Sequence, residues 1–381
     1  MPRKYKIMSR ARWYIAVIFI VAVVAAYVPV RNLTFALRMM SAMRSLASGS
    51  TAQELPVLVE KSFHRRGDQD LESIVYRPAR RHPERALVLV PGISELGCYH
   101  PRLVALSRAV ADQGFIVVTP DIRMFRQFRI GPEAMDEIAF WFDQAWSLTP
   151  GGDDRKVGLA GISFSGTLAL ITAARPEIRT RVAWVLGIGA YDDPLRCSRE
   201  WFAAGPVTVG PGYYPTRYYA RWIIMLAALD LLPSEAERRF LQTVLVDLLL
   251  QRAVTPPPFQ LPPDAERWQR TALMREDQED PVLARQIEDY LMPRLYANIT
   301  PDEAAAAVRC PVFLVHGAQD DLIPPEESRR LQQRLGTRAR LLISPFLTHT
   351  HPNEKPLGWR EKTKAAMDML EFFYNFAAVS R

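Results

Sequence analysis

Two serines stand two positions apart in the stretch KVGLAGISFSG, residues 156–166, and either could act as a nucleophile. The stretch reads as a buried strand that runs into a tight turn of small residues. A serine on such a strand-to-helix turn exposes its Oγ, and the N–H of the next residue lies at a helix N-terminus, where negative charge is stabilised. A serine alone is a poor nucleophile, so this chemistry also needs a base within hydrogen-bond reach.

The small residues around the turn favour Ser163 as the nucleophile. Because the turn is crowded, the positions two before and two after the nucleophile must be small. Around Ser163 these positions hold Gly161 and Ser165, and Gly166 follows. Around Ser165 they would hold Ser163 and Thr167, which fits less well. The stretch therefore differs from the pattern G-x-S-x-G only by a serine in place of its last glycine.

Two stretches further along the chain carry the groups that a nucleophilic serine needs. VFLVHGAQDDLIPPEES is a strand that ends in a loop with the carboxylates of Asp320 and Asp321. ARLLISPFLTHTHPNEKP is a last strand followed by His349 and His351. Ligands of a parallel sheet bind beyond the carboxyl ends of its strands, so these groups and the serine turn are expected at one edge.

The chain order serine, aspartate, histidine, each just after a strand, resembles the α/β-hydrolase superfamily of serine esterases and lipases. The resemblance covers roughly residues 55–192 and 305–381. The acid loop of that superfamily often reads G-x-x-D-x-x-[VI]-P. The matching positions here are Gly317, Asp320, Ile323 and Pro324. The resemblance thus selects Asp320, and Asp321 is expected to be a solvated loop carboxylate or a local cap.

The histidine loop of the superfamily often reads P-x-x-x-H with a later proline, which Pro345, His349 and Pro356 match. The resemblance therefore selects His349 over His351. In the triad that it implies, His349 takes the proton of the nucleophile and Asp320 holds the imidazole tautomer. A metal site made of the two histidines and Asp320 fits the strand contexts less well, and no cofactor is expected.

The resemblance also implies an oxyanion hole made of two backbone N–H groups. One belongs to Phe164, the residue after the nucleophile. The other is expected in the turn after ALVLVPG, which resembles the H-G-x turn of the superfamily with Pro91 in place of the histidine. Ile93 is the expected donor, and Gly92 would let the backbone approach. His100 could line the same pocket, although a structural role is expected for it and for His316.

Short apolar runs alternate with helix-length segments over most of the chain, which predicts a mostly parallel sheet with helices on both faces. The predicted strands are 71–76, 86–92, 115–121, 156–161, 181–189, 311–317 and 339–345. The predicted helices are 103–113, 132–148, 166–175, 325–335 and 361–379. No good strand occurs in 192–305, which reads as a helical cap inserted over one end of the sheet.

The chain has 381 residues, and its N-terminal fifty differ in character from the rest. Eight of the 48 basic residues and none of the 41 acidic ones lie there, so the remainder is close to neutral. This distribution argues against a nucleic-acid-binding face. Trp13–Val30 is uncharged and long enough to cross a bilayer, with a cleaved signal peptide as the alternative. The apolar row from Leu33 to Leu46 suits a helix on the membrane surface or docked on the protein.

These features predict residues 1–50 as a basic flank, transmembrane helix (13–30) and juxtamembrane helix, and residues 51–381 as the hydrolase domain with its cap. The basic residues on both sides of this segment favour an N-terminus in the cytoplasm and a catalytic domain outside it. We expect a serine hydrolase that cleaves an ester or related acyl bond of a small, lipophilic substrate. An acyltransferase with the same triad, or a non-catalytic binding protein of this fold, are the alternatives. The oligomeric state is left open.

Overall fold

The computed structural model describes residues 27–43, 55–152, 155–203, 216–254, 260–273, 280–347 and 357–380. Its strands are β1 (Val57–Arg66), β2 (Gln69–Pro78), β3 (Arg85–Val90), β4 (Phe115–Pro120), β5 (Val157–Ile162), β6 (Val182–Ile188), β7 (Val312–Gly317) and β8 (Ala339–Ser344). They form one eight-stranded sheet in the order β1-β2-β4-β3-β5-β6-β7-β8. β2 runs antiparallel to its neighbours β1 and β4, and every later pair is parallel.

The seven strands expected from the sequence are all present, with ends within two residues of those predicted. Most of their residues are buried, as the runs of Val, Leu and Ile require for strands covered on both faces. β1 was not predicted. It pairs along its whole length with β2 and lies at the edge of the sheet, with most of its side chains exposed.

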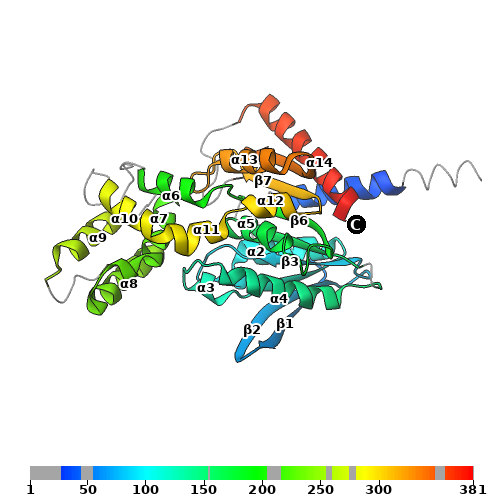
Figure 1. Ribbon diagram of the computed structural model, residues 1–381. Helices are drawn as coiled ribbons and strands as arrows, with labels where there is room; N and C mark the ends of the chain where they lie inside the picture. The colour runs from blue at the N-terminus through cyan, green and yellow to red at the C-terminus, as the bar shows by residue number, and fades with distance from the viewer. Residues whose placement is uncertain are drawn as a thin grey trace, which may run out of the picture.

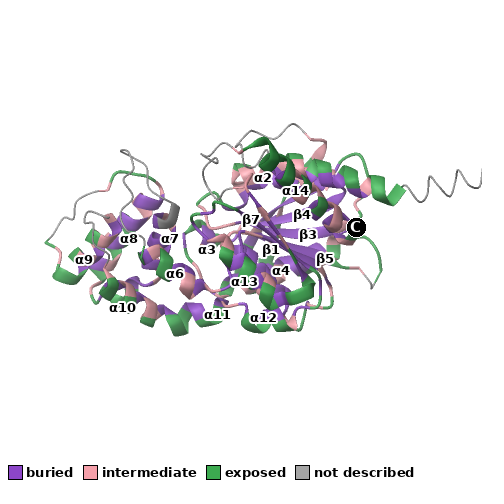
Figure 2. Cartoon of the chain, turned by 90° about the horizontal axis from the view of Figure 1, so that it is seen from above, coloured by how far each residue is buried: buried purple, intermediate pink, exposed green. Residues whose placement is uncertain are grey.

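Helices cover both faces of the sheet (Figures 1 and 2). One face packs on α2 (Pro101–Asp112), α14 (Trp359–Ser380) and the helix over 27–43. The other packs on α4 (Glu133–Leu148), α5 (Phe164–Ala173), α12 (Asp302–Ala307) and α13 (Pro325–Leu335). Shorter helical turns are η1 (Gly97–Tyr99), α3 (Arg123–Arg126), η2 (Leu229–Leu231) and η4 (Gly336–Arg338). The predicted mostly parallel sheet with two helical layers is confirmed.

The helix over 27–43 docks on the protein through one side. Phe35, Met39 and Met43 are buried in the core cluster that also contains α14 residues, and the Phe35 and Phe376 rings lie 6.0 Å apart. Leu33 and the rest of its outer face are exposed. The sequence allowed this helix to lie on a membrane surface or to dock on the protein, and these side chains dock on the protein.

The predicted transmembrane segment 13–30 lies outside the described residues except for 27–30, which are helical. Among the residues that the structure describes, no helix combines the length and apolar character needed to cross a bilayer.

A group of helices separates β6 from β7, and no described residue between these two strands is in a strand. Its members are α6 (Pro194–Ala203), α7 (Thr216–Ala227), α8 (Glu235–Leu249), α9 (Pro263–Leu273), α10 (Pro281–Leu291), the π-helical turn η3 (Met292–Tyr296) and α11 (Ala297–Ile299). We call α6–α11 the cap. Figures 1 and 2 both show it at one side of the sheet. Its buried residues, such as Trp222, Leu245 and Trp268, belong to the same hydrophobic cluster that covers one face of the sheet.

Candidate active site

Ser163 occupies the turn between β5 and α5 with a backbone conformation that is rare for a residue with a side chain. Its φ is 60° and its ψ is −130°, a region that favours glycine. The Ser163 N–H donates to the Ile188 carbonyl at the end of β6 (2.6 Å). Its own carbonyl accepts the Gly166 N–H at the start of α5 (2.8 Å). The end of the neighbouring strand and the first turn of the helix thus hold this strained geometry.

The glycines around Ser163 are required by the closeness of strand and helix. A Cβ at Gly161 would overlap the carbonyl group of Ser165 on α5. At Gly166 it would press on Ala190, at 3.2 Å from its Cβ. This crowding is the one expected of a sharp strand-to-helix turn around a nucleophile.

Ser165 is buried, with 1% of its surface exposed, and its hydroxyl is committed to the backbone. Its Oγ lies 2.7 Å from the Pro91 carbonyl oxygen, to which it can donate, and accepts the Ile162 N–H at 3.1 Å. This serine therefore ties the turn after β5 to the turn after β3. Of the two serines, Ser163 is the one that faces the cavity described below.

The two residues predicted for the oxyanion hole lie on turns next to Ser163. Phe164 is the first residue of α5, so its N–H has no acceptor within that helix. Ile93 follows Gly92, where an added Cβ would lie only 3.6 Å from the Cβ of Ser163. Both Phe164 and Ile93 line the same cavity as Ser163. The turn after β3 thus runs directly beside the candidate nucleophile.

Tyr219 on α7 reaches from the cap to this turn. Its hydroxyl donates to the Ile93 carbonyl oxygen at 2.9 Å, and its ring meets Phe128 edge-on. Burial raises the pKa of Tyr219 well above its ordinary value, so the hydroxyl remains a neutral donor. The cap therefore contributes a hydrogen bond that fixes the peptide next to the expected oxyanion donor.

Replacing Tyr219 by phenylalanine should lower kcat by up to about tenfold while changing KM little, because one hydrogen bond of about 1 kcal/mol is lost. A trifluoromethyl ketone, which mimics the tetrahedral state, should lose affinity by a similar factor. The matched control is Tyr296→Phe, which removes a buried tyrosine hydrogen bond to Ser198 Oγ without touching Ile93. Equal loss in both variants would show a general effect on the cap and contradict this role of Tyr219.

Asp320 is largely buried (8% exposed) in the loop after β7, whereas Asp321 is exposed. Oδ1 of Asp320 accepts the N–H groups of Leu322 and Ile323, each at 3.0 Å. Its Oδ2 lies 3.4 Å from Nε2 of the buried His316. The carboxylate is therefore held by its own loop and by the end of β7.

His316 has the structural role expected for it, since both ring nitrogens contact neighbours in the fold. Its Nδ1 lies 2.6 Å from Ser328 Oγ on α13, and its Nε2 lies 2.8 Å from the Ile323 carbonyl oxygen. Ser328 Oγ in turn donates to the Ala190 carbonyl at 2.9 Å. This chain of contacts links the Asp320 loop to the segment that follows β6.

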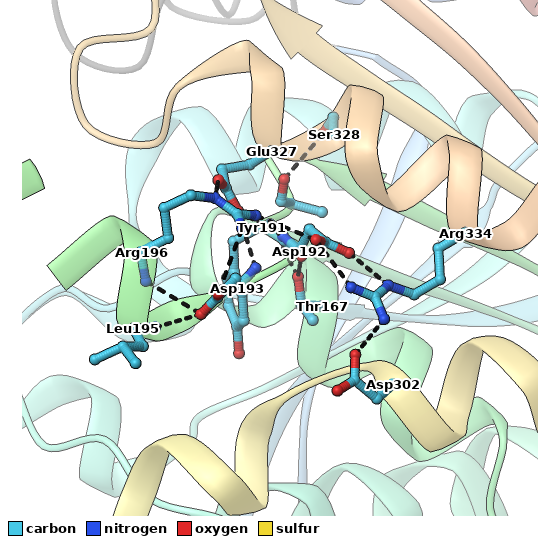
Figure 3. A network of polar contacts seen from close by, with 11 residues as sticks. Thr167, Tyr191, Asp192, Asp193, Leu195, Arg196, Asp302, Glu327, Ser328 and Arg334 are labelled. Carbon is cyan, nitrogen blue, oxygen red and sulfur yellow. Dashed lines mark hydrogen bonds and ion pairs between the residues drawn. The ribbon is translucent and has the colours of Figure 1, made fainter. Parts of the chain in front are cut away.

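The entry to the cap is bound to α13 by a network in which buried carboxylates pair with partly exposed arginines (Figure 3). Glu327 is 2% exposed and accepts the N–H groups of Asp192 and Asp193 at 3.0 and 2.9 Å. Arg196 pairs with the carboxylates of Glu327 and Asp192. Arg334 pairs with Asp192 at 2.8 Å. Because such charges are costly to bury unpaired, this network holds the base of the cap against the helix that follows Asp320.

One cavity of about 630 Å³ brings the candidate residues together. Ser163, Phe164, Ile93 and Asp320 all line it. Leu347, the last described residue before a gap at 348–356, lines it too. His349 and the alternative His351 lie outside the described residues. The structure therefore brings four of the five predicted catalytic and oxyanion residues to one cavity and does not describe the fifth.

His100 lines the cavity as well, and burial lowers its pKa below the ordinary value, with the charge of Arg102 adding to the effect. Among the described residues, no group of three or more His, Cys, Asp or Glu side chains could hold a metal ion. The roles of Ser165 and Tyr219 were not predicted. A serine in place of the expected glycine was the signal for the first. The second belongs to the tyrosine-rich stretch PGYYPTRYY, residues 211–219, whose expected role was packing with substrate contact as the alternative.

A mostly parallel sheet of this strand order, with a strained serine after β5 and a buried aspartate after β7, defines an α/β-hydrolase. The model of the family described as X-Pro dipeptidyl-peptidase (S15 family) matches residues 49–351, most of the chain. The chain therefore belongs to the S15 family. This membership and the serine turn together support a serine hydrolase.

The solved structures to which the chain is similar are distant in sequence. An acylaminoacyl peptidase from Pyrococcus horikoshii is 13% identical, with a TM-score of 0.46 over 85% of this chain and 41% of that one. A 2,6-dihydroxy-pseudo-oxynicotine hydrolase is 15% identical, with a TM-score of 0.46 over 83% of this chain and 68% of that one. The chain thus spans less than half the length of the acylaminoacyl peptidase. No curated protein matches the chain significantly.

Proposed function

We propose that this protein is a serine hydrolase that cleaves an ester or related acyl bond through an acyl-enzyme on Ser163. The observation that carries the proposal is the strained Ser163 turn, which lies on the wall of the same cavity as Asp320. Strain of this kind persists only where the surrounding structure enforces it, and it gathers at functional sites. The family membership supports the same class of chemistry.

In the proposed reaction, Ser163 Oγ attacks the acyl carbon while His349 accepts its proton. The oxyanion that forms is stabilised by the N–H groups of Phe164 and Ile93. His349 then gives its proton to the leaving group, and the acyl group stays on Ser163 as an ester. A water molecule, deprotonated by His349, attacks this ester. The acid is released as His349 returns the proton to Ser163 Oγ. Asp320 holds the imidazole and stabilises its charged form.

Cleavage of a peptide bond is the second candidate, and the family match is the observation that favours it. The family is described by dipeptidyl-peptidase activity on X-Pro sequences. The same triad and oxyanion hole act on either bond, because both reactions pass through a tetrahedral intermediate. Which bond the enzyme cleaves, ester or peptide, therefore depends on the leaving group and the acyl group that the site accepts.

Stopped-flow mixing with p-nitrophenyl butyrate tests the proposed acyl-enzyme. We expect a burst of nitrophenol equal to the enzyme concentration, followed by slower turnover. Repeating the assay with a long-chain alcohol separates hydrolysis from acyl transfer, since a transferase would release the alkyl ester in place of the acid. Purified, folded protein that shows neither burst nor turnover with esters or X-Pro anilides would favour the non-catalytic alternative.

The proposal retains Trp13–Val30 as a membrane tether, with the N-terminus inside and the hydrolase domain outside the cytoplasm. Its support is the uncharged sequence of that segment and the basic residues around it. Alkaline carbonate extraction of membranes tests the tether, and protease protection tests the side. Release of an N-terminally shortened chain would favour the cleaved signal peptide instead.

A further inference from the structure

We propose that the part of the cavity within the cap binds a neutral, apolar acyl group and does not accept the charged N-terminus of a peptide. This inference rests on the proposed function and adds the substrate class to it. It departs from the description of the family, because an X-Pro dipeptide carries a free ammonium group two residues before the bond to be cleaved.

Apolar side chains from two cap helices line the cavity beyond Ser163. Trp222, Ile223 and Ile224 come from α7, and Leu248 and Leu249 come from α8. All five are at most 7% exposed, and they belong to one hydrophobic cluster that continues into the cap core. A wall of this kind gains free energy from each apolar group that leaves water to lie against it.

The aromatic side chains of the wall turn their polar atoms into the protein. Trp222 Nε1 donates to the Ala272 carbonyl at 3.0 Å, and Trp201 Nε1 donates to the Leu322 carbonyl at 2.6 Å. Tyr296 donates its hydroxyl to Ser198 Oγ at 2.7 Å. The hydroxyls of Tyr219 and Tyr191 bond to backbone carbonyls in the same way. These aromatic residues therefore present mainly their carbon faces to a ligand.

The charges on the wall do not suit a substrate ammonium group. Asp320 is the only carboxylate among the lining residues that the structure describes, and its Oδ1 already accepts two backbone N–H groups. Cys197 adds no negative charge, since burial raises the pKa of its thiol well above the ordinary value. An ammonium group placed among the apolar side chains of α7 and α8 would find no carboxylate among these five residues and would be costly to bury there.

A series of p-nitrophenyl esters from acetate to decanoate, kept below their micelle concentrations, tests the inference. Each methylene that packs against the apolar wall contributes up to about 0.8 kcal/mol to transition-state binding. The value of kcat/KM should therefore rise about two- to fourfold per methylene until the cavity is filled. A flat or falling series would overturn the inference. Labelling of Ser163 by a fluorophosphonate, run in parallel, reports on the proposed function separately.

Two p-nitroanilides test the charge directly, because they share one leaving group. We expect N-acetyl-glycyl-proline p-nitroanilide to be cleaved at least as well as glycyl-proline p-nitroanilide, whose amine is free. A preference of tenfold or more for the free amine would show that the cavity binds an N-terminus. That result would overturn the apolar substrate class while leaving the serine hydrolase intact.

Variants of Leu248 test whether the acyl chain of the substrate binds within the cap. Leu248→Trp should move the best chain length towards shorter esters, and Leu248→Ala should move it towards longer ones. Opposite shifts cannot come from lost stability alone. The matched control is Leu245→Ala, on the same helix and fully buried but not on the cavity wall. It should leave the best chain length unchanged, and the same shift in all three variants would overturn the assignment.

Discussion

Replacing Ser163 by alanine should lower kcat for ester hydrolysis by about 10⁴-fold or more, with the fold intact. The variant lacks the oxygen that forms the acyl-enzyme, and the oxyanion donors alone leave only a small residual rate. Its matched control is Ser165→Ala, two positions away. That variant should keep the burst of nitrophenol, although loss of the bond to the Pro91 carbonyl should destabilise the fold by about 1 kcal/mol. If Ser165→Ala abolished the burst and Ser163→Ala did not, the assignment of the nucleophile would be wrong.

The same site predicts opposite effects on activity and stability when Ser163 becomes glycine. Glycine adopts a φ of 60° without steric cost, whereas serine and alanine do not. We therefore expect Ser163→Gly to be inactive but about 1 kcal/mol more stable to urea than the alanine variant. Equal stability of the two variants would mean that the turn relaxes in solution and holds no strain.

Replacing Asp320 by asparagine should lower kcat by about 10⁴-fold. This is the second of the two largest effects that we expect. The side chain keeps its size, and an amide oxygen can still accept the N–H groups of Leu322 and Ile323. The introduced amide, however, cannot accept an N–H from the imidazole through its NH₂ group or stabilise a positive imidazole. The loss should therefore appear in kcat, measured with p-nitrophenyl butyrate, while circular dichroism and the urea midpoint stay close to those of the wild type.

Asp321→Asn is the control for this second prediction, because the neighbouring carboxylate is exposed. It makes the same chemical change one residue away, so we expect kcat within about twofold of the wild type. A large loss at position 321 together with a small one at 320 would reverse the assignment that the acid-loop pattern gave.

The parts of the fold that follow from local sequence were predicted well. Strands such as β3 and β7 are continuous in apolar residues because helices bury both of their faces. β1 has no such signal, since most of its side chains face solvent and backbone pairing with β2 holds it in place. The helix over 27–43 is amphipathic in sequence, and that pattern is the same whether its apolar side meets lipid or the protein.

The site residues that could be predicted are those marked by local sequence, and those missed act through long-range contacts. Ser163 could be chosen from the sequence because the small residues that its turn requires lie within three positions of it. Asp320 could be chosen because its loop pattern is short and begins where β7 ends. Ser165 and Tyr219 act on Pro91 and Ile93, more than seventy and more than a hundred residues away. Contacts of that kind depend on how the cap and sheet pack, which no local pattern encodes.

Fluorophosphonate labelling of the purified protein, with the modified peptide mapped by mass spectrometry, tests the central claim most directly. The reagent reacts with a serine only where a base and an oxyanion hole activate it, so its adduct reports the machinery as well as the residue. We predict a single adduct, on Ser163, that is lost in Ser163→Ala and strongly slowed in Asp320→Asn. An adduct on Ser165, or no adduct on folded protein with either large or small probes, would contradict the claim that Ser163 is an activated nucleophile.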